Sequence, residues 1–265
     1  MKFRIKYLIK YLLFKLSFIL YWGKVKKIKK AIQKQENLGV KNIPIFIINF
    51  NRLSYVKNQV SMLISKGYNN IHIIDNNSSY APLLKWYENC DVDVIRLTKN
   101  YGHKVFWKCD LFEKYRNKFY VVTDPDVEPI TACPDNFVQI FFDYFKTYPL
   151  VWKIGFSLKI DDLPQNATLT SEVVKWERKF NERIFKISKA PLHYAEIDTT
   201  FALYGPDFLY DSLQKKWALR TDYPIQARHL PWYKCESDVT EEDLYYSKNK
   251  TNGWWDFVKG KVTPD

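Results

Sequence analysis

Short apolar runs alternate with amphipathic segments along the first half of the chain. The run from Ile43 to Phe50 is apolar almost throughout, and the next segment has apolar residues at helical spacing and stops at Gly67. A short apolar run of this kind is typical of a strand buried on both faces. Because strands and helices alternate in such short units, the pattern predicts an α/β fold with a mostly parallel sheet flanked by helices.

The same pattern continues along the chain. Strands are expected at 70–75, 93–97, 119–124, 151–160, 198–204 and 227–233, and helices at 81–88, 103–115, 134–148, 171–186 and 240–248, the fourth of these helices within a polar excursion at 161–192. Parallel sheets bind ligands beyond the carboxyl ends of their strands. We therefore expect one edge of the sheet to carry Asn51, Asp75, Asn77, Asn100 and Asp124.

The N-terminal segment has a different character. Residues 1–30 contain ten basic residues and no acid, so they hold most of the net charge of +12. Between Tyr7 and Trp22 the chain is apolar except for Lys10, Lys15 and Ser17. Lysines inside the apolar stretch are costly in a spanning helix, and no small-residue cleavage site follows it.

This pattern favours an interfacial amphipathic helix on an anionic membrane surface. A helix docked on its own domain is the second interpretation and a transmembrane span the third. Nucleic acid is not an expected partner, because nucleic-acid arms seldom carry so many large apolar residues. The expected location is cytoplasmic and peripheral, on the inner face of the cell membrane.

Length and composition indicate one globular domain with appendages. The chain has 265 residues, of which 46% are hydrophobic and 17% aromatic, and its four cysteines show no paired spacing. We divide it into a basic membrane-associating arm (1–40), a main α/β domain (41–236, with halves 41–130 and 131–236) and a C-terminal helical tail (237–265).

An acidic turn follows the fourth expected strand. Asp124 and Asp126 flank Pro125, whose ring fixes the local backbone. Two carboxylates at a strand end suit Mn²⁺ or Mg²⁺, and such an ion would bridge to the phosphates of a nucleotide. Asp91 and Asp93 have the same spacing but precede a strand, so they are most simply a solvated turn.

Four stretches resemble, in order and spacing, motifs of the nucleotide-sugar glycosyltransferases of the GT-A fold, especially the family 2-like bacterial enzymes. They are FIINFNRLSYVKNQV, IIDNNSS, LTKNYGHKVFWK and VVTDPDV, and the resemblance covers Ile43 to Tyr233. It implies a Rossmann-like, mostly parallel sheet and a metal-dependent transferase. The donor would be a nucleotide sugar, expected to be a UDP-sugar. The acceptor would be a glycan, expected to be a lipid-linked surface polysaccharide or oligosaccharide under construction.

The resemblance also implies roles for individual residues. Donor-binding positions are Asn49, Asn51, Arg52, Asp75, Asn77, Asn100, His103, Lys104 and Asp124, and the metal positions are Asp124, Asp126 and His229. Alternatives stay open for three of them. Asp75 could be only a cap, His103 a surface residue, and His229 a satisfied core histidine.

The chain departs from the family pattern at the catalytic base. The family's Glu-Asp pair at a later helix start is missing, and Glu196 and Asp198 instead precede the expected strand at 198–204. For an inverting transfer we rank Asp198 first as the base, Glu196 second and Asp222 third. The missing pair also keeps a second hypothesis open, a non-catalytic, membrane-associated subunit that binds a nucleotide or sugar.

Overall fold

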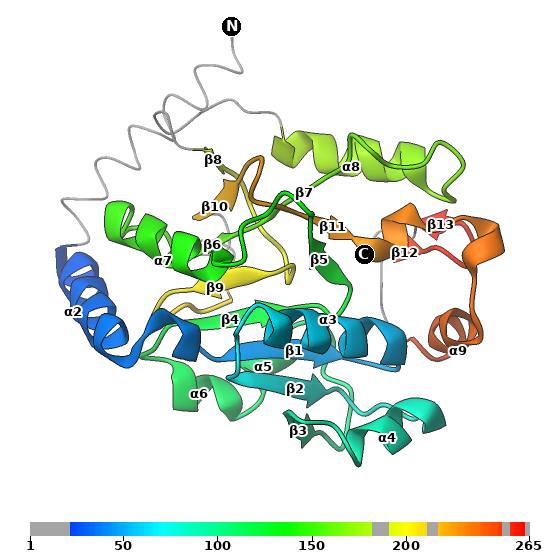
Figure 1. Ribbon diagram of the computed structural model, residues 1–265, viewed down its shortest axis with the longest axis horizontal. Helices are drawn as coiled ribbons and strands as arrows, with labels where there is room; N and C mark the ends of the chain where they lie inside the picture. The colour runs from blue at the N-terminus through cyan, green and yellow to red at the C-terminus, as the bar shows by residue number, and fades with distance from the viewer. Residues whose placement is uncertain (1–21, 182–190, 211–216, 251–254, 263–265) are drawn as a thin grey trace, which may run out of the picture.

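The computed structural model describes residues 22–181, 191–210, 217–250 and 255–262 of the chain. In these residues an eight-stranded sheet forms the centre of an α/β architecture, and helices pack against both of its faces (Figure 1). The expected fold class, a mostly parallel sheet flanked by helices, is confirmed.

The first half of the domain alternates strand and helix, as expected. Its elements are α2 (Trp22–Leu38), a 3-10 turn η1 (Val40–Asn42), β1 (Ile45–Asn49), α3 (Leu53–Ser65), β2 (Ile71–Asp75), α4 (Ala81–Tyr87), β3 (Asp93–Arg96), α5 (Val105–Lys108), α6 (Leu111–Tyr115) and β4 (Tyr120–Thr123). The single helix expected at 103–115 is two short helices, with Cys109 and Asp110 between them.

The second half has shorter strands, and several of them were not expected. Its elements are β5 (Val127–Pro129), α7 (Phe137–Thr147), β6 (Lys153–Gly155), β7 (Ser157–Leu158), α8 (Thr170–Asn181), β8 (Leu192–Tyr194), β9 (Ala202–Tyr204), β10 (Ala218–Thr221), β11 (Gln226–His229), the 3-10 turns η3 (Leu230–Tyr233) and η4 (Glu236–Asp238), α9 (Glu241–Asn249), β12 (Trp255–Asp256) and β13 (Lys261–Val262).

The strand order of the main sheet is β3-β2-β1-β4-β9-β6-β10-β8. β1, β2, β3 and β4 run parallel to one another, whereas β9 runs antiparallel to both β4 and β6, and β8 runs antiparallel to β10. A second sheet, in the order β5-β11-β7, packs beside it. The run at 151–160 therefore supplies two strands, β6 in the main sheet and β7 in the second. The strand expected at 227–233 ends at His229 and continues as η3.

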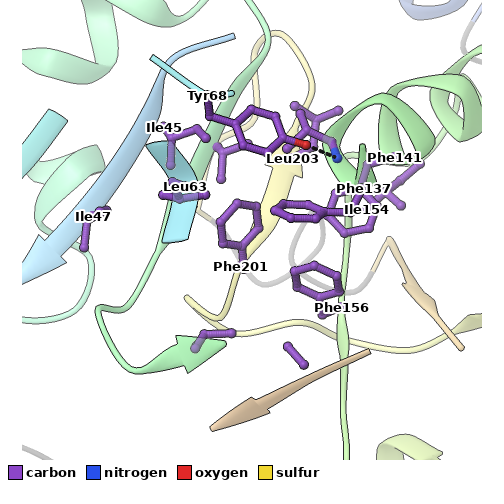
Figure 2. Close-up of a cluster of buried hydrophobic side chains, with 14 of the residues drawn as sticks. Ile45, Ile47, Leu63, Tyr68, Phe137, Phe141, Ile154, Phe156, Phe201 and Leu203 are labelled. Carbon is purple, nitrogen blue, oxygen red and sulfur yellow. Dashed lines mark hydrogen bonds between the residues drawn. The ribbon is translucent and has the colours of Figure 1, made fainter. Parts of the chain in front are cut away.

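Both faces of β1 are buried, which explains its continuous apolar sequence. Ile45 and Ile47 face the large core under α3 and α7, whereas Phe46 and Ile48 face a second core under α5 and α6. Alternate residues of a strand point to opposite faces, so one run fills two cores. Figure 2 shows part of the larger core.

Aromatic rings fill the larger core beneath the second half of the sheet. The rings of Phe137, Phe156 and Phe201 lie 5.2 to 5.5 Å apart between centroids (Figure 2). Gly155 lets β6 approach β9 closely, because a Cβ atom there would lie 2.5 Å from the carbonyl oxygen of Phe201. A larger residue at this position would push the two strands apart.

Helix α2 packs on the domain along one face. Val25, Ile28, Ile32 and Gln35 are buried, at the spacing expected for a helix stripe. Residues 22–38 of the expected arm therefore pack on the domain. The apolar segment from Tyr7, for which the membrane-surface, docked and transmembrane alternatives were considered, lies in residues 1–21, outside the described part. Among the described residues, no helix is both long and apolar enough to cross a membrane.

Candidate active site at the carboxyl edge of the sheet

Successive strands are added to the sheet first on one side of β1 and then on its other side. β2 and β3 extend the sheet on one side of β1, and β4 then adds to the other side. Open α/β sheets bind ligands at such a point, outside the carboxyl ends of the strands. Asp75 ends β2, and Asn51, Asn77, Asn100 and Asp124 lie in the segments that follow β1, β2, β3 and β4. Because these strands are parallel, the predicted placement of the five residues at one edge is confirmed.

The loop after β1 is fixed by asparagine. Asn51 has a φ of 54°, a left-handed conformation that asparagine tolerates better than most residues. Its side-chain oxygen accepts hydrogen bonds from the backbone amides of Ser79 (2.8 Å) and Tyr80 (3.0 Å). Asn51 thus joins the loops that follow β1 and β2, which makes it a structural element of the edge.

Asp75 lies fully buried at the end of β2. Its carboxylate accepts from the amide of Ser78 (3.3 Å), the hydroxyl of Tyr87 (3.3 Å) and Nε of Arg96 (3.4 Å). Burial and the neighbouring Asp75 charge raise the pKa of Tyr87. Both carboxylate oxygens are engaged, so the alternative of a capping role describes this geometry better than an open donor-binding carboxylate.

Asn76 joins the loops after β2 and β3, a role that sequence reasoning did not assign. Its amide nitrogen donates to Asn100 Oδ1 (2.8 Å) and to the carbonyl of Gly102 (3.1 Å), and its oxygen accepts from the amide of Tyr101 (2.8 Å). The predicted neighbour Asn77 is exposed, with a φ of 67°. The sequence places two adjacent asparagines, Asn76 and Asn77, in this turn. Only the structure shows that Asn76 is the one that joins the two loops.

His103 and Lys104 lie beside the ring of Tyr210. His103 is exposed, with its ring centroid 6.4 Å from that of Tyr210, and Nζ of Lys104 lies 4.9 Å over the same ring. The hydroxyl of Tyr210 donates to Asp198 Oδ1 (2.9 Å). The structure therefore brings the predicted donor residues His103 and Lys104 close to the predicted base.

The acidic turn is tied to the loop that carries Asp198. The amide of Asp124 donates to the carbonyl of Thr199 (3.1 Å), and the Thr199 hydroxyl donates to Asp124 Oδ2 (2.7 Å). Burial, followed by the negative charges of Asp126 and Asp198, raises the pKa of Asp124 to about 8. The negative charges of Asp126 and Asp198 thus add to burial in disfavouring ionisation of Asp124.

His229 reaches the same turn because β11 pairs with β5. The register places His229 beside Val127, and Leu230 donates its amide to the carbonyl of Asp126 (2.9 Å). Nε2 of His229 lies 3.4 Å from Asp126 Oδ1, without the geometry of a hydrogen bond. Burial lowers the pKa of His229, although the charge of Asp126 opposes this.

Buried polar atoms without a hydrogen-bond partner gather around this edge. Among the described residues they include Asn49 Oδ1, Asn51 Nδ2, the Tyr55 hydroxyl, Gln59 Oε1, Asp126 Oδ1, Thr200 Oγ1 and His229 Nδ1. Such atoms are rare in folded proteins and point to an absent ligand, ion or water. Tyr55 and Gln59 were not predicted from the sequence, because they occupy ordinary buried positions of the α3 pattern.

The residues of the acidic turn fit a Mg²⁺ or Mn²⁺ ion of the kind bound together with a substrate. No three His, Cys, Asp or Glu side chains converge as a ready metal cage in the described ranges. Magnesium sites of nucleotide enzymes commonly use one or two carboxylates and complete the shell with phosphate and water. Asp124 and Asp126 supply that number, and Asp126 Oδ1 accepts no hydrogen bond from the described residues.

The C-terminal helix α9 forms part of the wall of the site. Arg52 is buried, donates from a terminal guanidinium nitrogen to Asp243 Oδ1 (2.6 Å) and lies 3.8 Å from the ring centroid of Tyr246. The Glu242 carboxylate accepts from the amide and the hydroxyl of Ser54, at 2.8 Å each, and so caps the start of α3. Part of the expected tail at 237–265 is thus joined to the first half of the domain by contacts that the sequence does not reveal.

The loop of residues 195–200 carries both candidate bases. The strand expected from Asp198 begins only at Ala202, so Asp198 and Glu196 do not share a strand face as expected. Asp198 is exposed, and its charge acts on the pKa of Asp124. Glu196 is half-buried, and its charge acts on the pKa of Lys179. Asp222, the third choice, is buried and accepts from the amide of Tyr223 (2.8 Å).

Comparison with models of known protein families gives no match for this chain. A search of curated protein sequences likewise finds no match.

Proposed function

We propose that this protein is a metal-dependent glycosyltransferase of the GT-A type, transferring a sugar from a nucleotide-sugar donor to a glycan acceptor. The observation that carries the proposal is the acidic turn at the switch point of the sheet. There Asp124 and Asp126 lie among buried polar atoms that have no partner in the described residues. The four sequence motifs that resemble GT-A enzymes support the same conclusion.

In the proposed reaction an acceptor hydroxyl attacks the anomeric carbon of the donor sugar. The bond from that carbon to the diphosphate oxygen breaks, and the hydroxyl proton passes to a carboxylate, which we assign to Asp198. When bound, Mn²⁺ or Mg²⁺ supplies positive charge opposite the departing diphosphate. Asp124 and Asp126 would hold the ion, and the Thr199 hydroxyl fixes the orientation of Asp124.

A peripheral location on an anionic membrane is part of this proposal. Helix α2 buries one stripe on the domain and exposes Lys26, Lys29, Lys30 and Lys34 on its outer side. The sequence of residues 1–21, rich in lysine and large apolar residues, leads directly into this helix. A lysine near an anionic surface contributes about 1 kcal/mol to binding, so the four residues support a lipid-linked acceptor.

The direct test is hydrolysis and transfer with a panel of UDP-sugars in the presence of Mn²⁺. Asp126→Asn should lower the rate by about 10²-fold or more and weaken Mn²⁺-dependent nucleotide binding, because a hard oxygen ligand is lost. Asp93→Asn is the matched control. Asp93 opens β3 at the opposite edge and pairs with His72 (2.9 Å), so its rate should stay near that of the wild type.

Equal rates for the two variants would refute the assignment of the acidic turn. Nucleotide binding without any turnover would instead favour the non-catalytic subunit.

A further inference from the structure

Two long basic side chains are buried beneath the loop of residues 195–200. Lys153 of β6 is fully buried, and Arg220 of β10 is 3% exposed. Burial of such groups is costly unless they are paired and hydrogen-bonded. Strand positions inside a core normally carry apolar residues, so these two require an explanation.

Both side chains donate to the backbone of the loop. Nε of Arg220 donates to the carbonyl of Glu196 (2.7 Å), and Nζ of Lys153 donates to the carbonyl of Ile197. The hydroxyl of Tyr204 lies 3.5 Å from the next carbonyl, that of Asp198. These residues lie between β8 and β9, outside any strand, so no sheet ladder satisfies their carbonyl groups.

The other side of the same loop is fixed on the acidic turn. Thr199 accepts from the amide of Asp124 (3.1 Å) through its carbonyl and donates to the Asp124 carboxylate (2.7 Å) through its hydroxyl. Tyr210 donates to the Asp198 carboxylate (2.9 Å). The loop is therefore held by hydrogen bonds from two buried donors, Lys153 and Arg220, and by the hydrogen bonds between Thr199 and Asp124.

We propose that Lys153 and Arg220 are positioning residues that hold the Asp198 carboxylate against the Asp124 turn. This inference rests on the proposed function, in which Asp198 removes the acceptor proton. A displacement of about 1 Å in a reacting group can cost about 10²-fold in rate, so a backbone fixed at successive carbonyls has a direct effect on turnover.

The two donors have separate supports, so each can be tested alone. Arg220 pairs with Glu177 of α8 and lies 4.6 Å from the ring centroid of Phe180. Nζ of Lys153 lies 5.4 Å from the ring centroid of Phe208 and 5.6 Å from that of Tyr210. Aromatic faces attract an ammonium group, which favours its retention in this pocket.

Replacement of Lys153 by methionine separates a positioning role from a structural one. Methionine has a similar length and suits the aromatic surroundings. The substitution removes the buried charge but also removes the donor to the Ile197 carbonyl, so a modest loss of stability is expected in either case. A residue with only a structural role would leave the kcat of the folded protein intact. A positioning residue would lower kcat as well.

The experiment compares the full chain with Lys153→Met and with the control Lys66→Met. Lys66 follows α3 and pairs with Asp135 at 2.5 Å, remote from the loop in the contacts it makes. Three quantities are measured. They are the melting temperature, amide hydrogen exchange across residues 195–200, and the kcat and KM for hydrolysis of UDP-glucose, UDP-galactose and UDP-N-acetylglucosamine with Mn²⁺.

We expect Lys153→Met to lower the melting temperature by about a few degrees, to raise exchange in the loop about tenfold or more, and to lower kcat about 10- to 100-fold with little change in KM. Should Lys153→Met fail to fold, the double variant Arg220→Gln/Glu177→Gln replaces it, because it removes both members of the buried ion pair together.

Unchanged exchange in the loop would overturn the inference. Faster exchange with normal kcat would overturn the positioning role. If exchange rises but the wild type hydrolyses none of the three donors, the fastening of the loop stands and the proposed function fails for these donors.

Discussion

Replacing Asp243 by asparagine tests the link between the C-terminal helix and the site. The Asp243 side chain is 4% exposed and accepts from Arg52, Lys234 and the hydroxyl of Thr240. Burial by itself would raise the pKa of this carboxyl. The hydrogen bonds from Lys234 and Thr240 and the charge of Arg52 outweigh burial and lower the pKa of Asp243 to about 2.

The size of the effect follows from this shift. A carboxyl with a pKa of about 3.9 in the unfolded chain and about 2 in the folded protein contributes about 2 to 3 kcal/mol to the free energy of unfolding at neutral pH. Because the folded-state pKa is the lower one, this contribution is present above about pH 4 and is lost as the pH falls toward 2. About half of it remains at pH 3.

The measurement is urea unfolding of the wild type and of Asp243→Asn at pH 7 and pH 3. We expect the difference in free energy of unfolding to be about 2 to 3 kcal/mol at pH 7 and about half as large at pH 3. The control Asp161→Asn removes an exposed partner of Lys159 and should cost at most about 1 kcal/mol. Equal stability of Asp243→Asn and wild type at pH 7, or a difference independent of pH, would refute the reasoning.

Two further predictions concern the acceptor side and the membrane. Asp198→Asn should keep Mn²⁺ and nucleotide affinity but lower turnover about 10²-fold, the scale for loss of a positioned base, in assays with UDP-sugar donors. If Asp198→Asn retains turnover and Glu196→Gln does not, the base is Glu196. Replacing four of the exposed α2 lysines by glutamine (Lys26, Lys29, Lys30, Lys34) should weaken sedimentation with phosphatidylserine vesicles about 10²-fold or more, because each contributes about 1 kcal/mol. Replacing four exposed lysines elsewhere (Lys57, Lys85, Lys99, Lys108) is the control, and an equal loss there would show only a general charge effect.

The first half of the fold could be predicted because its signals are local. The run at Ile45–Ile48 is apolar on both faces since helices cover both faces, and asparagine or aspartate follows each strand where the chain turns. The edge that gathers Asn49, Asp75 and Asp124 follows from parallel strand order alone. The positions of these strands and their order along the chain can both be predicted from local sequence patterns.

The second half depends on partners distant in the sequence. A charged residue such as Arg220 is unusual in a buried strand, so the sequence pattern did not indicate β10. The burial of Arg220 is explained by its ion pair with Glu177, which lies 43 residues earlier. The run from Lys153 to Leu158 is continuous, yet the chain leaves one sheet for another at Phe156. Likewise, nothing local shows that Glu242 caps α3, because that contact joins residues 188 positions apart.

The position of α2 determines which way the site would face on a membrane. α2 leads into the amino end of β1, and Lys24 donates to the carbonyls of Leu150 and Val151, which precede β6. The helix thus lies at the amino edge of the sheet, opposite the edge with the acidic turn (Figure 1). A five-residue strand spans roughly 17 Å. With α2 resting on the bilayer, the reacting groups would stand at least that far above the headgroups. The proposed transferase would then reach the outer end of a tethered chain in preference to the sugar next to the lipid.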